Sequence, residues 1–264
     1  MKKIFKWPGG KTKELKRIKS LLPNSLNNII EPFAGSAALS FDLEKKSIIN
    51  DNDEHIMNLY YVIQDPSKYH LLKNECDLGM KLNKNQLEDH YYVCRDKINT
   101  RNFSNDIEMA YSFLVVRQLC FSGMFRINSK AEFNVPFGHY KNLKFNLNDN
   151  HHSFLNQKVF LFKDDFENII KLARKDDFIF VDPPYLQRAD YDITSKFTIS
   201  DHQRLFNLLS TTQAKWLLIH CEDPFYKQMY KNYNILSGDF QYSLNFKGRS
   251  NENQKVKHLY ITNY

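Results

Sequence analysis

Short apolar runs, each ended by a small, acidic or proline residue, recur along the chain. The clearest are NNIIEPF (27–33), SIIND (47–51), KVFLFK (158–163), DFIFVDPPY (177–185) and AKWLLIHC (214–221). Most are followed by a stretch with helical character. Strand followed by helix, repeated in this way, predicts an α/β fold in which helices cover both faces of a mostly parallel sheet. The alternating segment HLYITNY (258–264) is expected to close one edge of that sheet.

Between about residues 60 and 157 this alternation stops, and a helical, basic stretch takes its place. In SNDIEMAYSFLVVRQLC the apolar residues recur at helical spacing, and Ser104 at its start is the expected helix cap. The next segment, 121–145, is typical of loops and a hairpin and is rich in lysine and arginine. We therefore interpret 60–157 as an insertion into an α/β domain formed by 1–59 and 158–264.

The composition limits the partners of the protein. Its 264 residues carry a formal net charge of +7, which favours a polyanion. No run of about 20 apolar residues predicts a membrane span, and the start of the chain lacks the apolar core of a signal peptide. None of the four cysteines forms a C-x-x-C pair, so no metal site is expected and a reducing cytosol is the expected compartment.

The stretch FKWPGGKT (5–12) ends like a phosphate-binding loop. Such a loop needs G-x-x-x-x-G-K-[ST] after a strand, but Phe5 stands where the first glycine belongs, so a triphosphatase is disfavoured. What remains is a sharp turn, Lys11 at the start of a helix, and Trp7 beside it. This combination suits a carboxylate ligand, although on this segment alone a plain loop that enters a helix is the favoured interpretation.

Two further segments indicate a cofactor that carries adenosine. In EPFAGSAAL (31–39) a strand ends and small residues open a helix, which lets a ligand approach the backbone closely. Asp51 ends the next strand, where an acidic side chain can accept hydrogen bonds from ribose hydroxyls. The G-x-G-x-x-G pattern typical of NAD-binding proteins is absent.

The strongest signal is VDPPY, 181–185. An apolar strand delivers Asp182, two prolines and Tyr185 to the carboxyl edge of the sheet. Proline cannot continue a central strand, so the chain must turn outward, and its fixed backbone can aim a carbonyl. Two acceptors and a flat ring suit a planar base with an exocyclic amine. A purely structural Pro-Pro turn is the alternative, which the neighbouring features disfavour.

In combination, these motifs resemble the DNA adenine-N6 methyltransferases of the Dam type, which use S-adenosylmethionine. The matching segments, in the order of the family, are KWPGGK (6–11), EPFAGSAAL (31–39), Asp51 in IIND, EFNVPFG (132–138), KDDF (163–166), DPPY (182–185) and the terminal LYITNY. They extend over almost the whole chain.

The resemblance implies a Rossmann-like methyltransferase sheet with an inserted, mainly helical DNA-recognition domain. The chain departs from the family at Ala37, where a second glycine is usual. The extra methyl group is expected to fit, at some cost in cofactor affinity.

The resemblance also implies a role for individual residues. Asp182 and the Pro183 carbonyl would accept hydrogen bonds from the amine of the target adenine, and Tyr185 would stack on the base. S-adenosylmethionine would be bound by Trp7, Lys11, Phe33, Gly35, Asp51, Asp165, Phe166 and Asp182. DNA would be contacted by Lys6, Phe121, Ser122, Arg126, Asn134 and Arg188. Among these, Arg126 would read a guanine edge, and Phe121 would enter the stack beside the flipped adenine.

The implied function is methyl transfer from S-adenosylmethionine to N6 of a flipped-out adenine in double-stranded DNA, within a site that contains GAT, most simply GATC. We expect a monomer that binds no metal and no membrane, in the cytoplasm of a bacterium or of a phage-infected bacterial host. Two alternatives stay open: an RNA or protein amide methyltransferase, and a catalytically inactive DNA-binding regulator. The large insertion argues against the first alternative, and the intact DPPY motif argues against the second.

Overall fold

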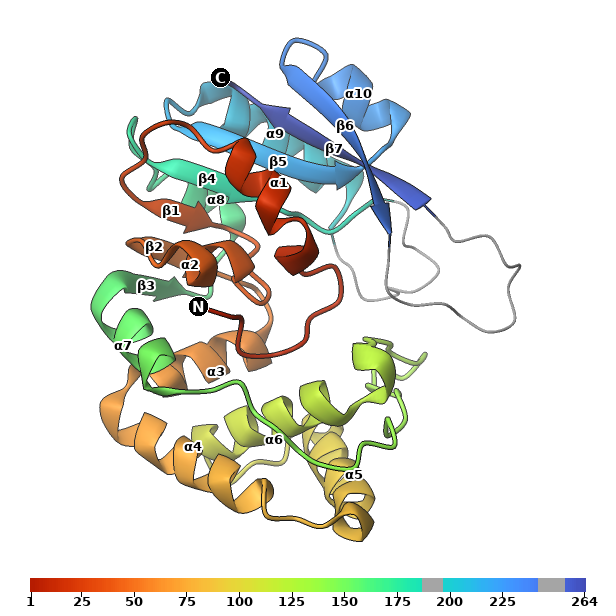
Figure 1. The fold of residues 1–264 in the computed structure, drawn as a ribbon. Coiled ribbons are helices and arrows are strands. Elements are labelled where there is room, and N and C mark those ends of the chain that lie inside the picture. The colour runs from red at the N-terminus through yellow and green to blue at the C-terminus, as the bar shows by residue number, and fades with distance from the viewer. Residues whose placement is uncertain (187–196, 242–254) are drawn as a thin grey trace.

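A computed structural model describes residues 1–186, 197–241 and 255–264 of the chain (Figure 1). Within them, seven strands form one sheet in the order β3-β2-β1-β4-β5-β7-β6. The strands are β1 (Ile29–Glu31), β2 (Ser47–Asn50), β3 (Val159–Phe162), β4 (Phe178–Val181), β5 (Lys215–Cys221), β6 (Asn234–Gln241) and β7 (Lys255–Thr262). Strands β1 to β5 pair in parallel, whereas β7 runs antiparallel to both of its neighbours. The predicted α/β class is thereby confirmed.

The last strand is not the edge strand that its sequence suggested. In β7, Tyr260 pairs with Ile219 of β5 on one side and with Leu236 of β6 on the other. The edge is β6, whose sequence NILSGDFQ includes a glycine and polar residues that weaken the strand pattern. The expectation that HLYITNY closes the sheet is therefore wrong.

Helices cover both faces of the sheet (Figure 1). Because side chains alternate along each strand, Phe178 and Leu217 enter one apolar cluster, while Ile179 and Leu218 enter another. The first cluster packs against α1 (Leu15–Ser20) and α2 (Ala38–Leu43). The second packs against α8 (Phe166–Ile170), α9 (Ile199–Thr211) and α10 (Pro224–Met229). This arrangement is the Rossmann-like layering implied by the resemblance.

A group of helices occupies the chain between β2 and β3. Its members are α3 (Glu54–Gln64), α4 (Pro66–Gly79), α5 (Lys84–Thr100), α6 (Asp106–Leu119) and α7 (Asp149–Lys158). In Figure 1, α4, α5 and α6 lie below the sheet, and α3 and α7 lie near its β3 edge. Helix α6 is capped by Asn105, whose side chain accepts the N–H of Glu108, so Ser104 is not the cap. Within the described ranges, no helix is long and apolar enough to cross a bilayer.

The helical part and the sheet share one apolar core. Ile49 of β2 and Val159 of β3 belong to the same buried cluster as Leu114 of α6. The two boundaries expected for the insertion, near residues 60 and 157, fall within α3 and α7, and these helices pack against each other. The chain therefore passes between the two parts through packed helices.

Candidate active site

The first feature of the site is a partly buried ion pair at the carboxyl edge of the sheet. Lys11 begins the short 3-10 helix η1 (Lys11–Lys13) and is only 4% exposed. Its Nζ atom donates to Oδ2 of Asp182 at 2.6 Å and to the Gly9 carbonyl at 2.8 Å. Asp182 directly follows β4, the central strand of the sheet. The pair therefore joins the N-terminal glycine turn to the DPPY segment.

The charges of this pair are balanced in a partly dry environment. Burial raises the pKa of Asp182, and the Lys11 ammonium opposes that shift. The ring of Tyr185 lies 5.3 Å from the Lys11 Nζ atom. Among the described residues, Lys11 has two acceptors for its three ammonium protons, so a third N–H can bind a ligand.

The second feature is the turn between β1 and α2. Gly35 has φ of +49°, and a Cβ atom there would lie 2.8 Å from Cδ1 of Trp7. Trp7 thus rests directly on the glycine backbone. Ala37, the N-cap of α2, also lies in the left-handed region, with φ 45° and ψ 43°. A side chain costs roughly 1–2 kcal/mol in that region, which explains why glycine suits this position better.

The side chain of Asp51 holds this turn through hydrogen bonds to backbone N–H groups. Its Oδ2 atom accepts the N–H of Gly35 at 2.7 Å, and its Oδ1 atom accepts the N–H of Asp53 at 2.9 Å. Burial, the largest cause, raises the pKa of Asp51 to about 6. Each carboxylate oxygen keeps a further lone pair, so a ligand hydroxyl can still bind. The sequence did not reveal that Asp51 also holds the glycine turn.

Asn50, the last residue of β2, was not expected at the site, and its side chain joins the loops after β1 and β3. Its side-chain amide is buried and donates to the carbonyls of Pro32 at 2.9 Å and Asp164 at 3.0 Å. Its Oδ1 atom accepts the N–H of Asp164 at 2.8 Å. A buried polar side chain needs such partners, so an asparagine at the end of an apolar strand was the available signal.

Aromatic rings form the third feature. Phe33, Phe166 and Phe197 lie with ring centroids 5.2 to 5.5 Å apart. Asp165 caps α8, and its Oδ2 atom pairs with Arg204 at 2.9 Å, while the Arg204 guanidinium lies 4.4 Å from the Phe166 ring. Phe197 and Arg204 were missed because they come from another part of the chain.

A layer of buried polar residues supports the DPPY segment. The imidazole Nε2 of His220 accepts the N–H of Leu186 at 3.3 Å, and the His220 ring lies 4.7 Å from that of Tyr185. Burial lowers the pKa of His220 to about 4, which keeps the ring neutral and able to accept this bond. A second group of buried residues centres on Glu14. Its carboxylate accepts a hydrogen bond from the Tyr260 hydroxyl at 2.6 Å and contacts Nδ1 of His258 at 2.8 Å.

The residues expected to contact DNA lie on the helical part and the N-terminal segment. Phe121 and Ser122 lie in the short helix η2 (Phe121–Gly123); Phe121 is 47% exposed. Arg126 is exposed, and its Nε and Nη2 atoms donate to the side chain and backbone carbonyls of Asn134 at 2.7 and 3.0 Å. Lys6 donates to the Gln118 carbonyl at 3.0 Å. Arg188 lies outside the described residues.

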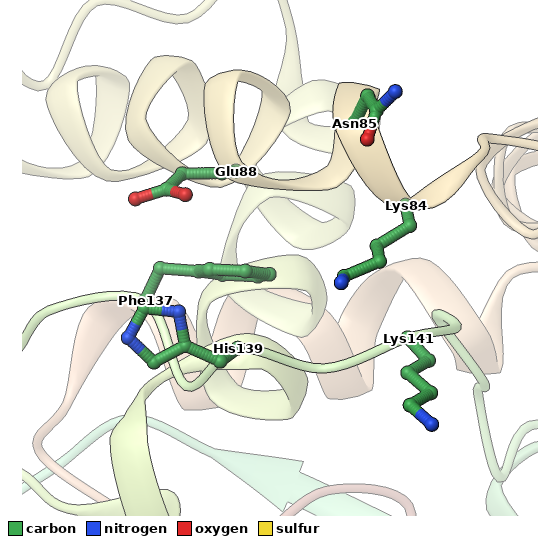
Figure 2. Close-up of a pocket in the computed structure, with 6 residues that line it drawn as sticks. All are labelled: Lys84, Asn85, Glu88, Phe137, His139 and Lys141. Atoms are coloured by element: carbon green, nitrogen blue, oxygen red, sulfur yellow. The ribbon is translucent and has the colours of Figure 1, made fainter.

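An open pocket not foreseen from the sequence lies on the helical part, between the start of α5 and the segment that follows EFNVP (Figure 2). Its lining comprises Lys84, Asn85, Glu88, Phe137, His139 and Lys141. Phe137 forms a bridge with Cys120, the residue before η2. The pocket is a partly basic hollow, and its lining contains none of the expected cofactor residues. Across the described ranges, no group of three or more side chains could hold a metal ion.

Glu31 is a buried carboxylic acid behind the ion pair. It ends β1, is 2% exposed, and accepts the N–H of Ser40 at 2.8 Å. Burial raises its pKa to about 7, and the charge of Asp182 adds to the shift. Between its ordinary value of 4.5 and this value the folded state binds more protons than the unfolded state, so stability falls as the pH rises.

We therefore predict that Glu31→Gln, which keeps an acceptor for Ser40 but cannot ionise, gains stability relative to the wild type as the pH rises. At about pH 8 the gain should be on the order of 3 kcal/mol, and it should shrink toward the value at about pH 4. Urea unfolding of both proteins across this pH range measures the difference. A difference that stays constant with pH would contradict the raised pKa of Glu31.

Comparisons with known proteins identify the family of the chain. The family model of the D12 class N6 adenine-specific DNA methyltransferases matches residues 7–244. The chain is 31% identical over 274 residues to the Type II methyltransferase M.CviBI of Paramecium bursaria Chlorella virus NC1A, with all of both chains covered. It is 30% identical to the Type II methyltransferase M1.LlaDCHI of Lactococcus lactis subsp. cremoris, over all of this chain and 96% of that protein. A DNA adenine methylase of Haemophilus influenzae is 30% identical over 69% of this chain and 63% of its own length. The chain belongs to the D12 class of N6 adenine-specific DNA methyltransferases.

Proposed function

We propose that the protein transfers a methyl group from S-adenosylmethionine to N6 of an adenine flipped out of double-stranded DNA, within a short site that contains GAT. The observation that carries this proposal is the 2.6 Å contact between Lys11 and Asp182 beside the Tyr185 ring. It brings the segment expected to bind the methyl donor to the segment expected to bind the base. Residues 1–59 and 158–264 would act on the donor and the base, and residues 60–157 would recognise the target.

The described residues fit S-adenosylmethionine chemically. Lys11 offers a cation to the carboxylate of the methionine part. The Trp7 ring, which lies against the Gly35 backbone, offers an apolar wall. Asp51 offers acceptors to the ribose hydroxyls. Phe33 and Phe166 offer apolar rings to the adenine of the cofactor, and Asp165 offers it an acceptor. The bound cofactor supplies an electrophilic methyl group on a sulfonium.

The chain's own contribution to the reaction is positioning and electrostatics. The lone pair of the adenine N6 amine is delocalised into the ring, so the amine is a poor nucleophile. Asp182 uses Oδ2 for Lys11, which leaves Oδ1 able to accept one amine proton, and the Pro183 carbonyl can accept the other. These two hydrogen bonds localise the lone pair, and Tyr185 holds the base in plane. Such fixed acceptors in a partly dry site lower the barrier without covalent catalysis.

The helical part supplies features suited to DNA. A base inside a duplex cannot reach Asp182, so it must leave the stack, at a cost of a few kcal/mol. The exposed Phe121 can take the vacated space, and the adjacent Ser122 can contact the partner base. The lysines of the Figure 2 pocket, Lys84 and Lys141, suit phosphate contacts on the flanking duplex.

For the sequence of the site we propose GATC. Arg126 is held by Asn134 through two hydrogen bonds, which orients its guanidinium before DNA arrives. A guanidinium matches the O6 and N7 acceptors of guanine. The resemblance of the segment 121–138 to the Dam pattern supports the GAT core, and the palindrome supplies the final cytosine, opposite the guanine that Arg126 would read.

The overall test compares transfer of a tritiated methyl group to duplex DNA, RNA and protein. We expect N6-methyladenine in duplex DNA alone. Transfer to RNA or to a protein amide would favour the alternative substrate classes, and folded protein that binds DNA without any transfer would favour an inactive regulator.

Replacing Asp182 with alanine should abolish methyl transfer while the protein stays folded, because the variant loses both the Lys11 partner and the amine acceptor. The rate should fall by far more than tenfold, which corresponds to about 1.4 kcal/mol. Asp77→Ala, at an exposed position of α4, is the matched control and should keep the wild-type rate. Retention of a tenth of the rate or more by Asp182→Ala would sink the assigned role.

Alanine substitutions at two glycines distinguish the effect of a steric clash from the effect of backbone strain on cofactor binding. Gly35 and Gly9 both have positive φ, but a Cβ atom on Gly35 would clash with Trp7, whereas one on Gly9 meets nothing within 4 Å. Gly35→Ala should therefore weaken S-adenosylmethionine binding at least about tenfold, and Gly9→Ala only about threefold or less. Calorimetric titration without DNA gives both affinities. Equal losses would mean that Trp7 is not a wall of the cofactor site.

Alanine variants of Arg126 and Phe121 should lose different properties, the first sequence discrimination and the second the rate of methylation. Arg126→Ala should lose about 1–3 kcal/mol of discrimination, at the base pair that it reads and at no other. Phe121→Ala should slow methylation and leave the preferred sequence unchanged, since an apolar wedge compensates unstacking without reading a base edge. Methylation rates on duplexes substituted one base pair at a time distinguish these results. If Arg126→Ala loses activity equally on every duplex, Arg126 contacts only phosphate.

A further inference from the structure

A buried arginine lies between the cofactor segment and the DNA-contacting segment. Arg117, on α6, is only 1% exposed. No carboxylate lies within ion-pair distance of it in the described part of the chain, and burial lowers its pKa. Burying an unpaired guanidinium is costly unless hydrogen bonds satisfy it. The contacts that Arg117 makes are therefore the reason that it can lie there.

The guanidinium of Arg117 binds two separate segments of the chain through three carbonyls. Its Nε atom donates to the Lys6 carbonyl at 3.0 Å. Its Nη2 atom donates to the Gly123 carbonyl at 2.8 Å, and its Nη1 atom donates to the Met124 carbonyl at 2.9 Å. The guanidinium also lies 5.4 Å from the ring of Trp7. One planar group thus fixes the backbone before Trp7 and the backbone after Ser122.

These two segments serve different ligands under the proposed function. Trp7 rests on Gly35 and would form a wall of the methyl-donor site, while η2 carries Phe121 and Ser122 toward the DNA. A ligand that moves or orders Trp7 acts on the Lys6 carbonyl directly. The rigid fork of the guanidinium passes that change to Gly123 and Met124, because its donors cannot rotate independently.

We infer that Arg117 is a positioning residue that couples the methyl-donor site to the DNA-contacting segment η2. Binding of the donor or its product orders η2, and DNA held by η2 in turn tightens the donor site, since coupling between two sites is reciprocal. The inference rests on the proposed function, but it concerns binding and can be tested apart from methyl transfer.

The test measures the dissociation constant for a GATC duplex with and without S-adenosylhomocysteine. In the wild type, the ligand should tighten DNA binding at least about fivefold. Arg117→Lys keeps the charge but loses the planar fork, so the ratio should fall toward one. The matched control is Arg95→Lys, since Arg95 also donates to a carbonyl, that of Val135 at 3.3 Å, and also lies on a ring, that of Tyr92. It should keep the wild-type ratio.

A wild-type protein without coupling, or a folded Arg117→Lys variant with the wild-type ratio, would overturn the inference. Hydrogen exchange on the wild type provides a second test that does not depend on the folding of a variant. S-adenosylhomocysteine alone should slow exchange at the amides of Gly123 and Met124, and unchanged exchange there would also overturn the inference. Failure of the proposed function has a different signature, which is DNA binding and coupling without methyl transfer.

Discussion

The candidate site depends on one partly buried ion pair, between Lys11 and Asp182, which lie 171 residues apart in sequence. Separately, a lysine after a glycine turn and an aspartate before two prolines are ordinary loop residues. Once joined at 2.6 Å, they define a point where a cation, a carboxylate and the Tyr185 ring meet at the carboxyl edge of a parallel sheet. Ligands of open α/β sheets bind at this edge. The glycine turn, Asp51 and the aromatic rings all lie along the same edge.

Burial explains why this site needs a supporting layer. Carboxyl groups with little water around them have raised pKa values, as in Glu31 and Asp51. They remain acceptable because backbone N–H groups donate to them. Asn50 satisfies its polar atoms by joining the end of β2 to the loops after β1 and β3. The same bonds that meet the cost of burial therefore also fix the positions of the functional side chains.

The sequence predicted the features that local chemistry determines, and it failed where partners come from distant segments. Apolar runs and their stops located β1 to β5, but β6 was missed because its polar, glycine-containing sequence is stabilised by pairing with β7. Motif residues such as Lys11 and Asp182 carry chemistry that can be recognised in the sequence. Arg117 and Arg204 were not singled out, since nothing near them in the sequence reveals the carbonyls or rings that they contact.

The central claim is that this edge of the sheet joins a methyl donor to an adenine of double-stranded DNA. The most direct measurement is to express the wild-type protein in a host that lacks adenine methylation and to sequence the host DNA with a method that reads N6-methyladenine. The account predicts N6-methyladenine at one short sequence that contains GAT, throughout the genome. Host DNA without N6-methyladenine, in cells that contain the folded protein, would contradict it.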